Sequence, residues 1–296
     1  MDTECSQRWG KHVPQFIALL VAIVWMITPG AAQAQSRLTL VVGFAPGGTS
    51  STAARIIAES LEGITGQSVL VENRPGASGA ISAETVRQQK NSRTLLFMSS
   101  TSALSIPPDS GLVPVGIVAG YSYVVVARKD APPTFEEYVK AARSDVAFRT
   151  VGTAGAGSVA HMIGERLFER HGLNMRHIPY KGSAPAIQDV LGAHIALAVT
   201  PVPDFVGFKD EMRVVAETGR GFDTDGWVAI YAPPGTPAAE VHQLSVLFEE
   251  ASSRSGDALE RMGFKPQWRT GDELLSVHRR QYRELFPVLT RLGLTP

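Results

Sequence analysis

Two glycine-rich segments of the sequence have the residue types and spacing of loops that bind anions. One spans residues 43–49 (Gly-Phe-Ala-Pro-Gly-Gly-Thr) and the other spans residues 152–158 (Gly-Thr-Ala-Gly-Ala-Gly-Ser); each has two glycines five residues apart, followed by a hydroxyl side chain. Each segment follows an apolar run and precedes helical spacing, which predicts a helix N-terminus, where unpaired N–H groups and the helix dipole favour a negative ligand. Because glycine lets a ligand approach the main chain closely, the pair predicts an anion-binding site.

Neither segment has the lysine with which a phosphate-binding loop reaches the terminal phosphates of a nucleotide, so the sequence disfavours nucleotides. For either segment alone, an ordinary turn between strand and helix is an equally good interpretation. Their matching places in two repeats of the chain favour the binding site over the turn.

Further polar residues accompany these two segments. His161 falls in the first turn of the helix after the second segment, where it either reaches a ligand or bonds loop carbonyls. Tyr180 and Lys181 follow a strand and precede a helix, so they either line the same cleft or lie on a solvated turn. Arg74 is placed to steer an anion, whereas Ser78 lacks the Gly-x-Ser-x-Gly pattern of a serine nucleophile and is expected in a structural loop.

The sequence shows no set of residues typical of an enzyme. It has no His-x-x-x-His pair, no paired-carboxylate motif, no nucleophile elbow and no cofactor fingerprint beyond its glycines. We therefore expect no metal, no cofactor and no catalysis, and interpret the chain as a binding protein. Basic and acidic residues are equal in number, 28 of each, which gives no indication of a nucleic acid or an anionic membrane as partner.

The first 34 residues have the pattern of a cleaved secretory signal. Arg8 and Lys11 precede an apolar stretch at 16–27, which is shorter than the ~20 residues of a membrane span, and an Ala-x-Ala site ends at Ala34. Removal of 34 of the 296 residues leaves 262, with no cysteine because Cys5 lies in the signal. Secretion without disulfides indicates the bacterial periplasm.

The rest of the sequence repeats one order of elements. The strands are expected at 38–42, 69–71, 94–98, 115–118, 123–127, 146–151, 175–179, 195–200, 212–216 and 227–231. The helices are expected at 51–61, 79–89, 134–143, 158–171, 185–193, 237–252 and 272–292. Two β-α-β-α-β runs, each too short for a sheet of five or more strands, predict an α/β protein with two lobes. The expected domains are the signal at 1–34, a discontinuous first lobe at 35–128 and 232–296, and a second lobe at 129–231.

Five ordered motifs resemble the substrate-binding proteins of tripartite tricarboxylate transporters, also called the Bug family, over residues 37–292. They lie at 46–55 (Pro-Gly-Gly-Thr to Ala-Arg), 71–77 (Val-Glu-Asn-Arg-Pro-Gly-Ala), 155–161 (Gly-Ala-Gly-Ser with His), 178–186 (Ile-Pro-Tyr-Lys-Gly-Ser-Ala-Pro-Ala) and 232–237 (Ala-Pro-Pro-Gly-Thr-Pro). The resemblance implies a two-lobed periplasmic binding protein of type II topology. It also implies hinge closure over a small carboxylate and delivery of that ligand to a membrane permease.

The same resemblance implies which residues surround the ligand. The first lobe would contribute Phe44, Ala45, Pro46, Gly47, Gly48, Thr49, Ser50, Ser51, Ser99, Thr101 and Ser102. The second lobe would contribute Thr153, Ala154, Gly155, Ala156, Gly157, Ser158 and His161, with Tyr180, Lys181 and Thr200 at the edge of the cleft.

The sequence departs from the family pattern at two of these places. Ser51 stands where family members usually carry Asp, and Thr200-Pro201 stand where Asp or Asn is common. An amino-acid ligand would need a carboxylate for its ammonium group, so a plain mono- or dicarboxylate is favoured. Two other functions fit the same fold: a ligand-binding receptor that engages a sensor kinase, and an enzyme.

Overall fold

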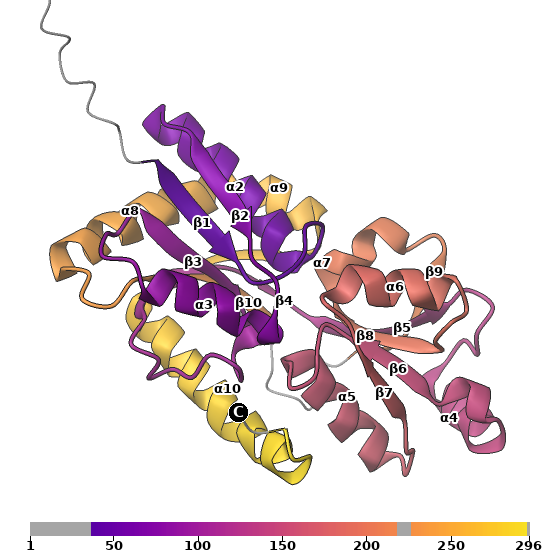
Figure 1. Cartoon of the computed structure of the whole chain (residues 1–296). Coiled ribbons are helices and arrows are strands. Elements are labelled where there is room, and N and C mark those ends of the chain that lie inside the picture. Colours follow the sequence, from indigo (N-terminus) through magenta and orange to yellow (C-terminus); the bar gives the residue numbers. More distant parts are fainter. Residues whose placement is uncertain (1–36, 218–225, 295–296) are drawn as a thin grey trace, which may run out of the picture. The chain divides into compact units, whose positions relative to one another are not determined.

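The computed structural model describes residues 37–217 and 226–294 (Figure 1). Its strands are β1 Leu38–Val42, β2 Val69–Asn73, β3 Thr94–Ser99, β4 Val113–Tyr121, β5 Tyr123–Arg128, β6 Thr150–Thr153, β7 Arg176–Pro179, β8 Leu197–Pro201, β9 Met212–Glu217, β10 Gly226–Ala232 and β11 Lys265–Thr270. Its α-helices are α2 Thr49–Thr65, α3 Ala80–Arg87, α4 Phe135–Ser144, α5 Val159–Arg170, α6 Ser183–Leu191, α7 Val202–Phe205, α8 Ala238–Arg254, α9 Gly256–Arg261 and α10 Gly271–Arg291. Short 3-10 turns lie at Ala77–Gly79, Ser100–Ser102, Val146–Phe148 and Val206–Phe208.

The strands form two separate sheets with the same internal order. The first has the order β11-β4-β10-β3-β1-β2, and the second has the order β7-β6-β8-β5-β9. In each sheet three strands are parallel, and the next strand, β10 or β5, is antiparallel and comes from the other part of the chain. This exchange of one strand is the type II order, so the predicted two-lobed α/β fold is confirmed. We call each sheet with its helices a lobe.

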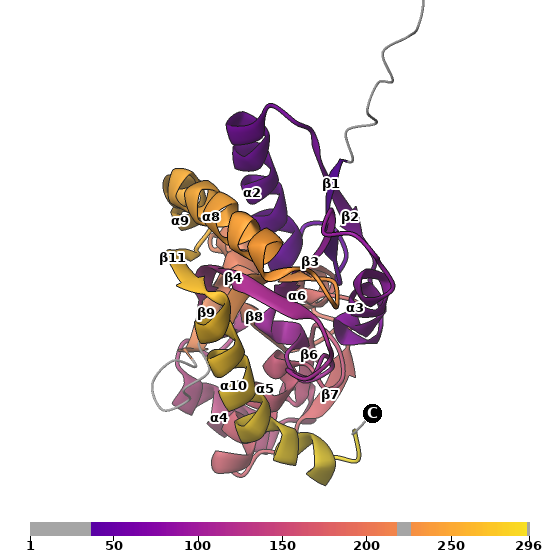
Figure 2. The same cartoon turned by 90° about the vertical axis from the view of Figure 1, so that its left-hand side faces the viewer.

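Right-handed crossovers decide which face of a sheet each helix covers. The chain moves from β1 through α2 to β2 at the sheet edge, and then returns over β1 through α3 to β3. Because both crossovers are right-handed and run in opposite directions, α2 and α3 cover opposite faces. Helix α8 packs beside α2, as Figure 2 shows, and α10 packs on β4. The strands between these layers are apolar on both faces: Leu95, Leu96 and Phe97 of β3 are all buried.

The chain crosses between the lobes at Ser122, which joins β4 of the first sheet to β5 of the second. Strand β9 of the second sheet ends at Glu217, and β10 of the first sheet begins at Gly226. Around the crossing at Ser122, the hydroxyls of Tyr121 and Tyr123 lie 3.0 and 3.1 Å from the Ser100 hydroxyl oxygen, so the crossing is fixed by a buried polar cluster. Burial raises the pKa of both tyrosines, which therefore remain neutral. The boundaries expected from the sequence counted β5 with the first lobe and β10 with the second, whereas strand pairing assigns them the other way round. We propose Ser122 as one lobe boundary, and the end of β9 at Glu217 and the start of β10 at Gly226 as the limits of the two lobes at the other.

Several elements differ from the sequence-based expectation. Each sheet has at least five strands, because the exchanged strand and a further strand complete it. The strand expected at 146–151 begins as a 3-10 turn, and the helix expected from Pro185 begins two residues earlier. Helix α9 and strand β11 were not predicted. Strand β11 lacks alternating apolar residues, since it is an edge strand paired only with β4.

Candidate functional site

A small cavity of ≈ 50 Å³ lies where the carboxyl ends of strands from both lobes meet. It is lined by Phe44, Ala45, Pro46, Gly48, Thr49, Ser50, Ser99, Thr101, Ala154, Gly182, Ser183, Ala184, Pro185, Pro201 and Asp204. The first eight residues belong to the loop before α2, the first turn of α2, the end of β3 and the 3-10 turn after it. The others lie after β6 and β7, at the end of β8 and in α7. Ligands of open α/β sheets bind at this edge, because the loops that leave the strands converge there.

The first loop presents the N-terminus of α2 to this cavity. Gly48 is the N-cap residue and provides no side chain to satisfy the N–H groups of the first turn. Gly47 has a φ of 89°, in the left-handed region that favours glycine. Gly48 has an ordinary φ of −85°, and a Cβ added there would meet only the Ala45 carbonyl oxygen, at 3.8 Å. Of the two glycines, only Gly47 is therefore required by the backbone.

Asp204 brings a carboxylate from the second lobe to this same helix end. The residue is 8% exposed, and the Thr49 hydroxyl donates a 2.7 Å hydrogen bond to its Oδ1. Burial raises the pKa of Asp204 to about 6, while hydrogen bonds from Ser183 and Thr49 act in the opposite direction. The sequence offered too little context to assign Asp204 a role. Its one signal is its position in the short helix α7, which follows the buried strand β8 at the edge where loops converge.

The second glycine-rich loop contributes little to the cavity wall. Of its residues, only Ala154 lines the cavity. The Ser158 hydroxyl caps α5 by accepting a hydrogen bond from the His161 N–H at 3.2 Å. The Gly157 N–H donates to His161 Nδ1, also at 3.2 Å. His161 thus bonds a loop N–H group, where the sequence suggested loop carbonyls, and its ring holds the loop in place.

A second histidine supports this ring from behind. The rings of His161 and His177 stack with centroids 3.6 Å apart, and His177 Nε2 lies 2.8 Å from the Thr153 hydroxyl. Burial, followed by the neighbouring His161, lowers the pKa of His177 to about 4, so His177 is neutral at physiological pH. Within residues 37–217 and 226–294, no group of three or more His, Cys, Asp or Glu residues could hold a metal ion.

The remaining residues expected around the ligand lie outside the cavity wall. They are Gly47, Ser51, Ser102, Thr153, Gly155, Ala156, Gly157, Ser158, His161, Tyr180, Lys181 and Thr200. Tyr180 donates a 2.6 Å hydrogen bond to Asp189, and the Ser51 hydroxyl is buried without a hydrogen-bond partner. The lining residues that sequence reasoning missed are Gly182 to Pro185, Pro201 and Asp204. Four of these directly follow Tyr180 and Lys181 in the sequence, so the cavity wall includes residues of the same loop but not the two residues that the sequence suggested.

Hydrogen bonds between side chains and loops join the lobes around this cavity, in addition to those of Tyr123 near the crossing at Ser122. Besides the bond between Thr49 and Asp204, the Ser78 hydroxyl donates to the Ala156 carbonyl at 3.0 Å. Arg291 at the end of α10 makes two 3.0 Å hydrogen bonds with Glu169 of α5. Ser78 is thus a structural residue, as the sequence predicted, and the structure shows the lobes in contact on several sides of the cavity.

Comparison with known proteins identifies the family. The model of the tripartite tricarboxylate transporter family receptor matches residues 53–210. A UPF0065 protein of Agrobacterium vitis, from the TAR-I ttuE-ttuC' intergenic region, is 31% identical over 272 residues, which cover 80% of this chain and 78% of that protein. The chain belongs to this receptor family. Protein BugT of Bordetella pertussis, 28% identical over 87% of this chain and 90% of its own length, is similar as well.

The fold of this receptor-family chain is also found among solved structures. The structure of R. palustris Rpa4515 with adipate has a TM-score of 0.80 and 24% identity, and covers 89% of this chain and 99% of that one. The resemblance to the Bug family is confirmed, and the chain is a solute-binding protein of this type. None of the helices in residues 37–217 and 226–294 is both long and apolar enough to span a membrane. The expected signal lies outside the described residues.

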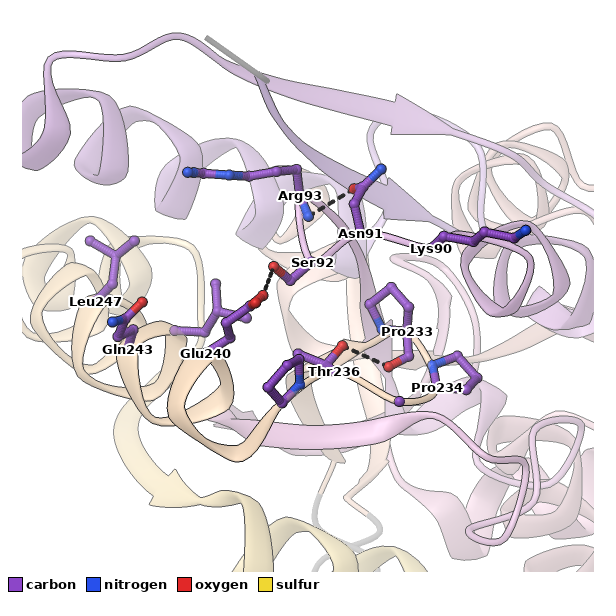
Figure 3. Close-up of a pocket in the computed structure, with 13 residues that line it drawn as sticks. Lys90, Asn91, Ser92, Arg93, Pro233, Pro234, Thr236, Glu240, Gln243 and Leu247 are labelled. Carbon is purple, nitrogen blue, oxygen red and sulfur yellow. Dashed lines mark hydrogen bonds between the residues drawn. The ribbon is translucent and has the colours of Figure 1, made fainter.

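A larger groove of ≈ 740 Å³ lies elsewhere on the first lobe of this family member. It runs between the loop 90–93 and the start of α8 (Figure 3). The Ser92 hydroxyl donates to Glu240, and the Thr236 hydroxyl donates to the Pro233 carbonyl, so these polar groups pair with one another. The motif 232–237, which contributed to the family resemblance, thus shapes this groove and lies outside the cavity between the lobes.

Proposed function

We propose that the protein captures a small carboxylate in the periplasm, in the cavity between its lobes, and delivers it to the membrane permease of a tripartite tricarboxylate-type transporter. One observation carries the proposal: in a chain of this receptor family, the uncapped N-terminus of α2 faces a cavity that both lobes line. Main-chain N–H groups at a helix end suit a carboxylate. The adipate in the structure of Rpa4515 supports the same ligand class.

Hinge motion would admit the ligand. The cavity of ≈ 50 Å³ has room for about four water molecules at the ~10–15 Å³ that each requires. A dicarboxylate of adipate size has more heavy atoms than this space holds, so the lobes must separate to admit it and close less tightly around it. The crossing at Ser122, between β4 and β5, is a place where the chain can bend.

Closure moves the carboxylate out of water, so the protein must replace its hydration shell. The N–H groups at the start of α2 and the hydroxyls of Ser50 and Thr101 supply donors from the first lobe. The start of α6, where no side chain caps the helix, supplies main-chain N–H groups from the second lobe. Binding to donors on both lobes would favour the closed form, which a permease recognises. This mechanism needs no covalent step.

The test combines native mass spectrometry with calorimetry. We expect the freshly purified protein to retain a carboxylate, and the protein freed of ligand to bind one of a series of mono- and dicarboxylates. Gly48→Val should fold normally, because its Cβ has space, but should lose binding because the side chain enters the cavity. Gly63→Val is the matched control, since Gly63 lies on the same helix, away from the cavity, with nothing within 4 Å of its Cβ. Equal binding by both variants would refute the site.

Uptake distinguishes delivery from sensing. If deletion of the protein abolishes uptake of the bound carboxylate, the transport role holds. If uptake is unchanged and only a transcriptional response to the ligand is lost, the protein serves a sensor kinase. Turnover of the bound carboxylate on incubation would contradict a binding role altogether.

A further inference from the structure

The walls of the cavity carry one formal charge, and it is negative. Among the described residues that line the cavity, Asp204 alone has an ionisable side chain. The side chains that hydrogen-bond to it, those of Thr49 and Ser183, are neutral. Lys181 precedes the lining residues and is exposed, and the guanidinium of Arg74 is paired with Glu72 at 2.7 Å. The carboxylate of Asp204 is therefore buried beside the ligand space without a cation.

We propose that Asp204 selects ligands that carry a hydrogen-bond donor, an ammonium or hydroxyl group, on the carbon next to their carboxylate. This inference rests on the proposed function and names the class of carboxylate that the cavity takes. It revises the expectation from the sequence, which found no acidic side chain near the first loop and therefore favoured plain carboxylates. Asp204 supplies that acidic group from the other lobe.

The first step is the capacity of Asp204 to accept a further hydrogen bond. An ionised carboxylate has about four acceptor positions. Thr49 donates through its hydroxyl and its backbone N–H, and Ser183 donates through its hydroxyl, which occupies three at most. A position is left for a ligand. A buried carboxylate that has only neutral partners is stabilised most by a cationic donor and less by a hydroxyl, and it repels a second carboxylate.

The second step is the short distance between Asp204, which would accept a hydrogen bond from the ligand, and the N–H groups of α2, which would bind the ligand carboxylate. Asp204 Oδ1 lies 2.7 Å from the hydroxyl of Thr49, and Thr49 is the first residue of α2. The N–H groups that would bind the ligand carboxylate start at the next residue, Ser50, because the Thr49 N–H donates to Asp204. Donor and carboxylate of the ligand must therefore lie close together, which a 2-amino or 2-hydroxy acid provides. A donor at the far end of the molecule does not reach Asp204 from this position.

Calorimetry with matched acids on the full mature chain tests the inference. One series is succinate, malate and aspartate, and the other is propionate, lactate and alanine; each differs only in the group on the second carbon. In at least one series, we expect the amino or hydroxy acid to bind with an affinity about tenfold or more above that of the plain acid. One charge-assisted hydrogen bond provides a difference of this size. Tighter binding of the plain acid in both series would overturn the inference.

Two substitutions of Asp204 distinguish an ammonium donor on the ligand from a hydroxyl donor. Asp204→Asn keeps a hydrogen-bond acceptor without the charge, so it should reduce amino-acid binding about tenfold and leave the hydroxy acid nearly unchanged. Asp204→Ala should remove both preferences. Asp210→Asn, an exposed carboxylate outside the cavity, is the control for loss of charge. Because the readout is the ratio of affinities within a series, a purely structural effect of Asp204, which weakens all acids alike, would leave the ratio unchanged and refute the inference.

The result also distinguishes this inference from the proposed function. If the wild-type protein binds adipate but no acid of either series, it is a carboxylate receptor and selection by Asp204 is wrong. If no carboxylate binds at all, the proposed function fails, and the inference with it.

Discussion

The buried carboxylate of Asp204 makes the stability of the unliganded protein depend on pH in one direction. Burial raises its pKa from the ordinary 3.8 to about 6. The folded protein thus holds this proton more tightly than the unfolded chain does. The free energy of unfolding therefore falls as the pH rises from about 4 to about 6, and this group lowers it by about 3 kcal/mol at neutral pH. This stability is fully present at pH values below the pKa of Asp204 in the unfolded chain and is lost as the pH rises to the pKa in the folded protein.

Asp204→Asn isolates this contribution, because the amide resembles the neutral acid in shape and cannot ionise. Urea unfolding of both proteins, followed by circular dichroism between about pH 4 and pH 7, gives their free energies of unfolding. We expect similar values at about pH 4 and a variant more stable by about 3 kcal/mol at pH 7. Asp210→Asn should follow the wild type, since Asp210 is exposed. A constant difference between Asp204→Asn and the wild type across this range would refute the burial of an ionisable group between the lobes.

Three further substitutions test the loops and the contacts between the lobes. Gly47→Ala should lower the free energy of unfolding by about 1–2 kcal/mol because of the positive φ, whereas Gly48→Ala should change it little, both measured by urea unfolding. His161→Phe preserves an aromatic ring but leaves the Gly157 N–H without its acceptor, which should cost about 1–3 kcal/mol and increase hydrogen exchange at that amide. Arg291→Ala breaks an exposed ion pair, so its effect should stay below about 1 kcal/mol and vanish at high salt.

The sequence predicted the fold because its signals are local. Apolar runs such as 38–42 and 94–98 are continuous where helices cover both faces of a sheet, and the structure has strands there. The boundaries between the lobes were harder to predict from the sequence. Pro-rich segments near 133 and 232 resembled crossings, but the chain crosses inside apolar sequence at Ser122, where the strands on either side are both buried. Only pairing between distant strands reveals which sheet each one joins.

The candidate site was predicted in part for a similar reason. The loop before α2 has a recognisable strand, glycine turn and helix, and it lines the cavity. The second loop has the same pattern but uses its polar atoms internally, with Ser158 capping α5 and Gly157 bonded to His161. Glycine spacing cannot distinguish a loop whose N–H groups face a ligand from one whose groups are already satisfied. Asp204 was missed because its partner Thr49 lies 155 residues away in the sequence.

Closure of the empty protein should itself respond to pH. When Asp204 is neutral, the Thr49 hydrogen bond contributes about 1 kcal/mol to holding the lobes together. Ionisation in the closed form costs about 3 kcal/mol relative to an open form in which water reaches the carboxylate, so the net contribution changes sign as the pH rises toward 6. The exposed Arg291 pair adds little to offset this cost. We therefore expect the radius of gyration from small-angle scattering to be larger at about pH 7 than at about pH 4, and Asp204→Asn to abolish this change. A donor-bearing ligand should restore the smaller radius at neutral pH, because it stabilises the ionised carboxylate in the closed form; a radius that is independent of pH in the wild type would refute the coupling.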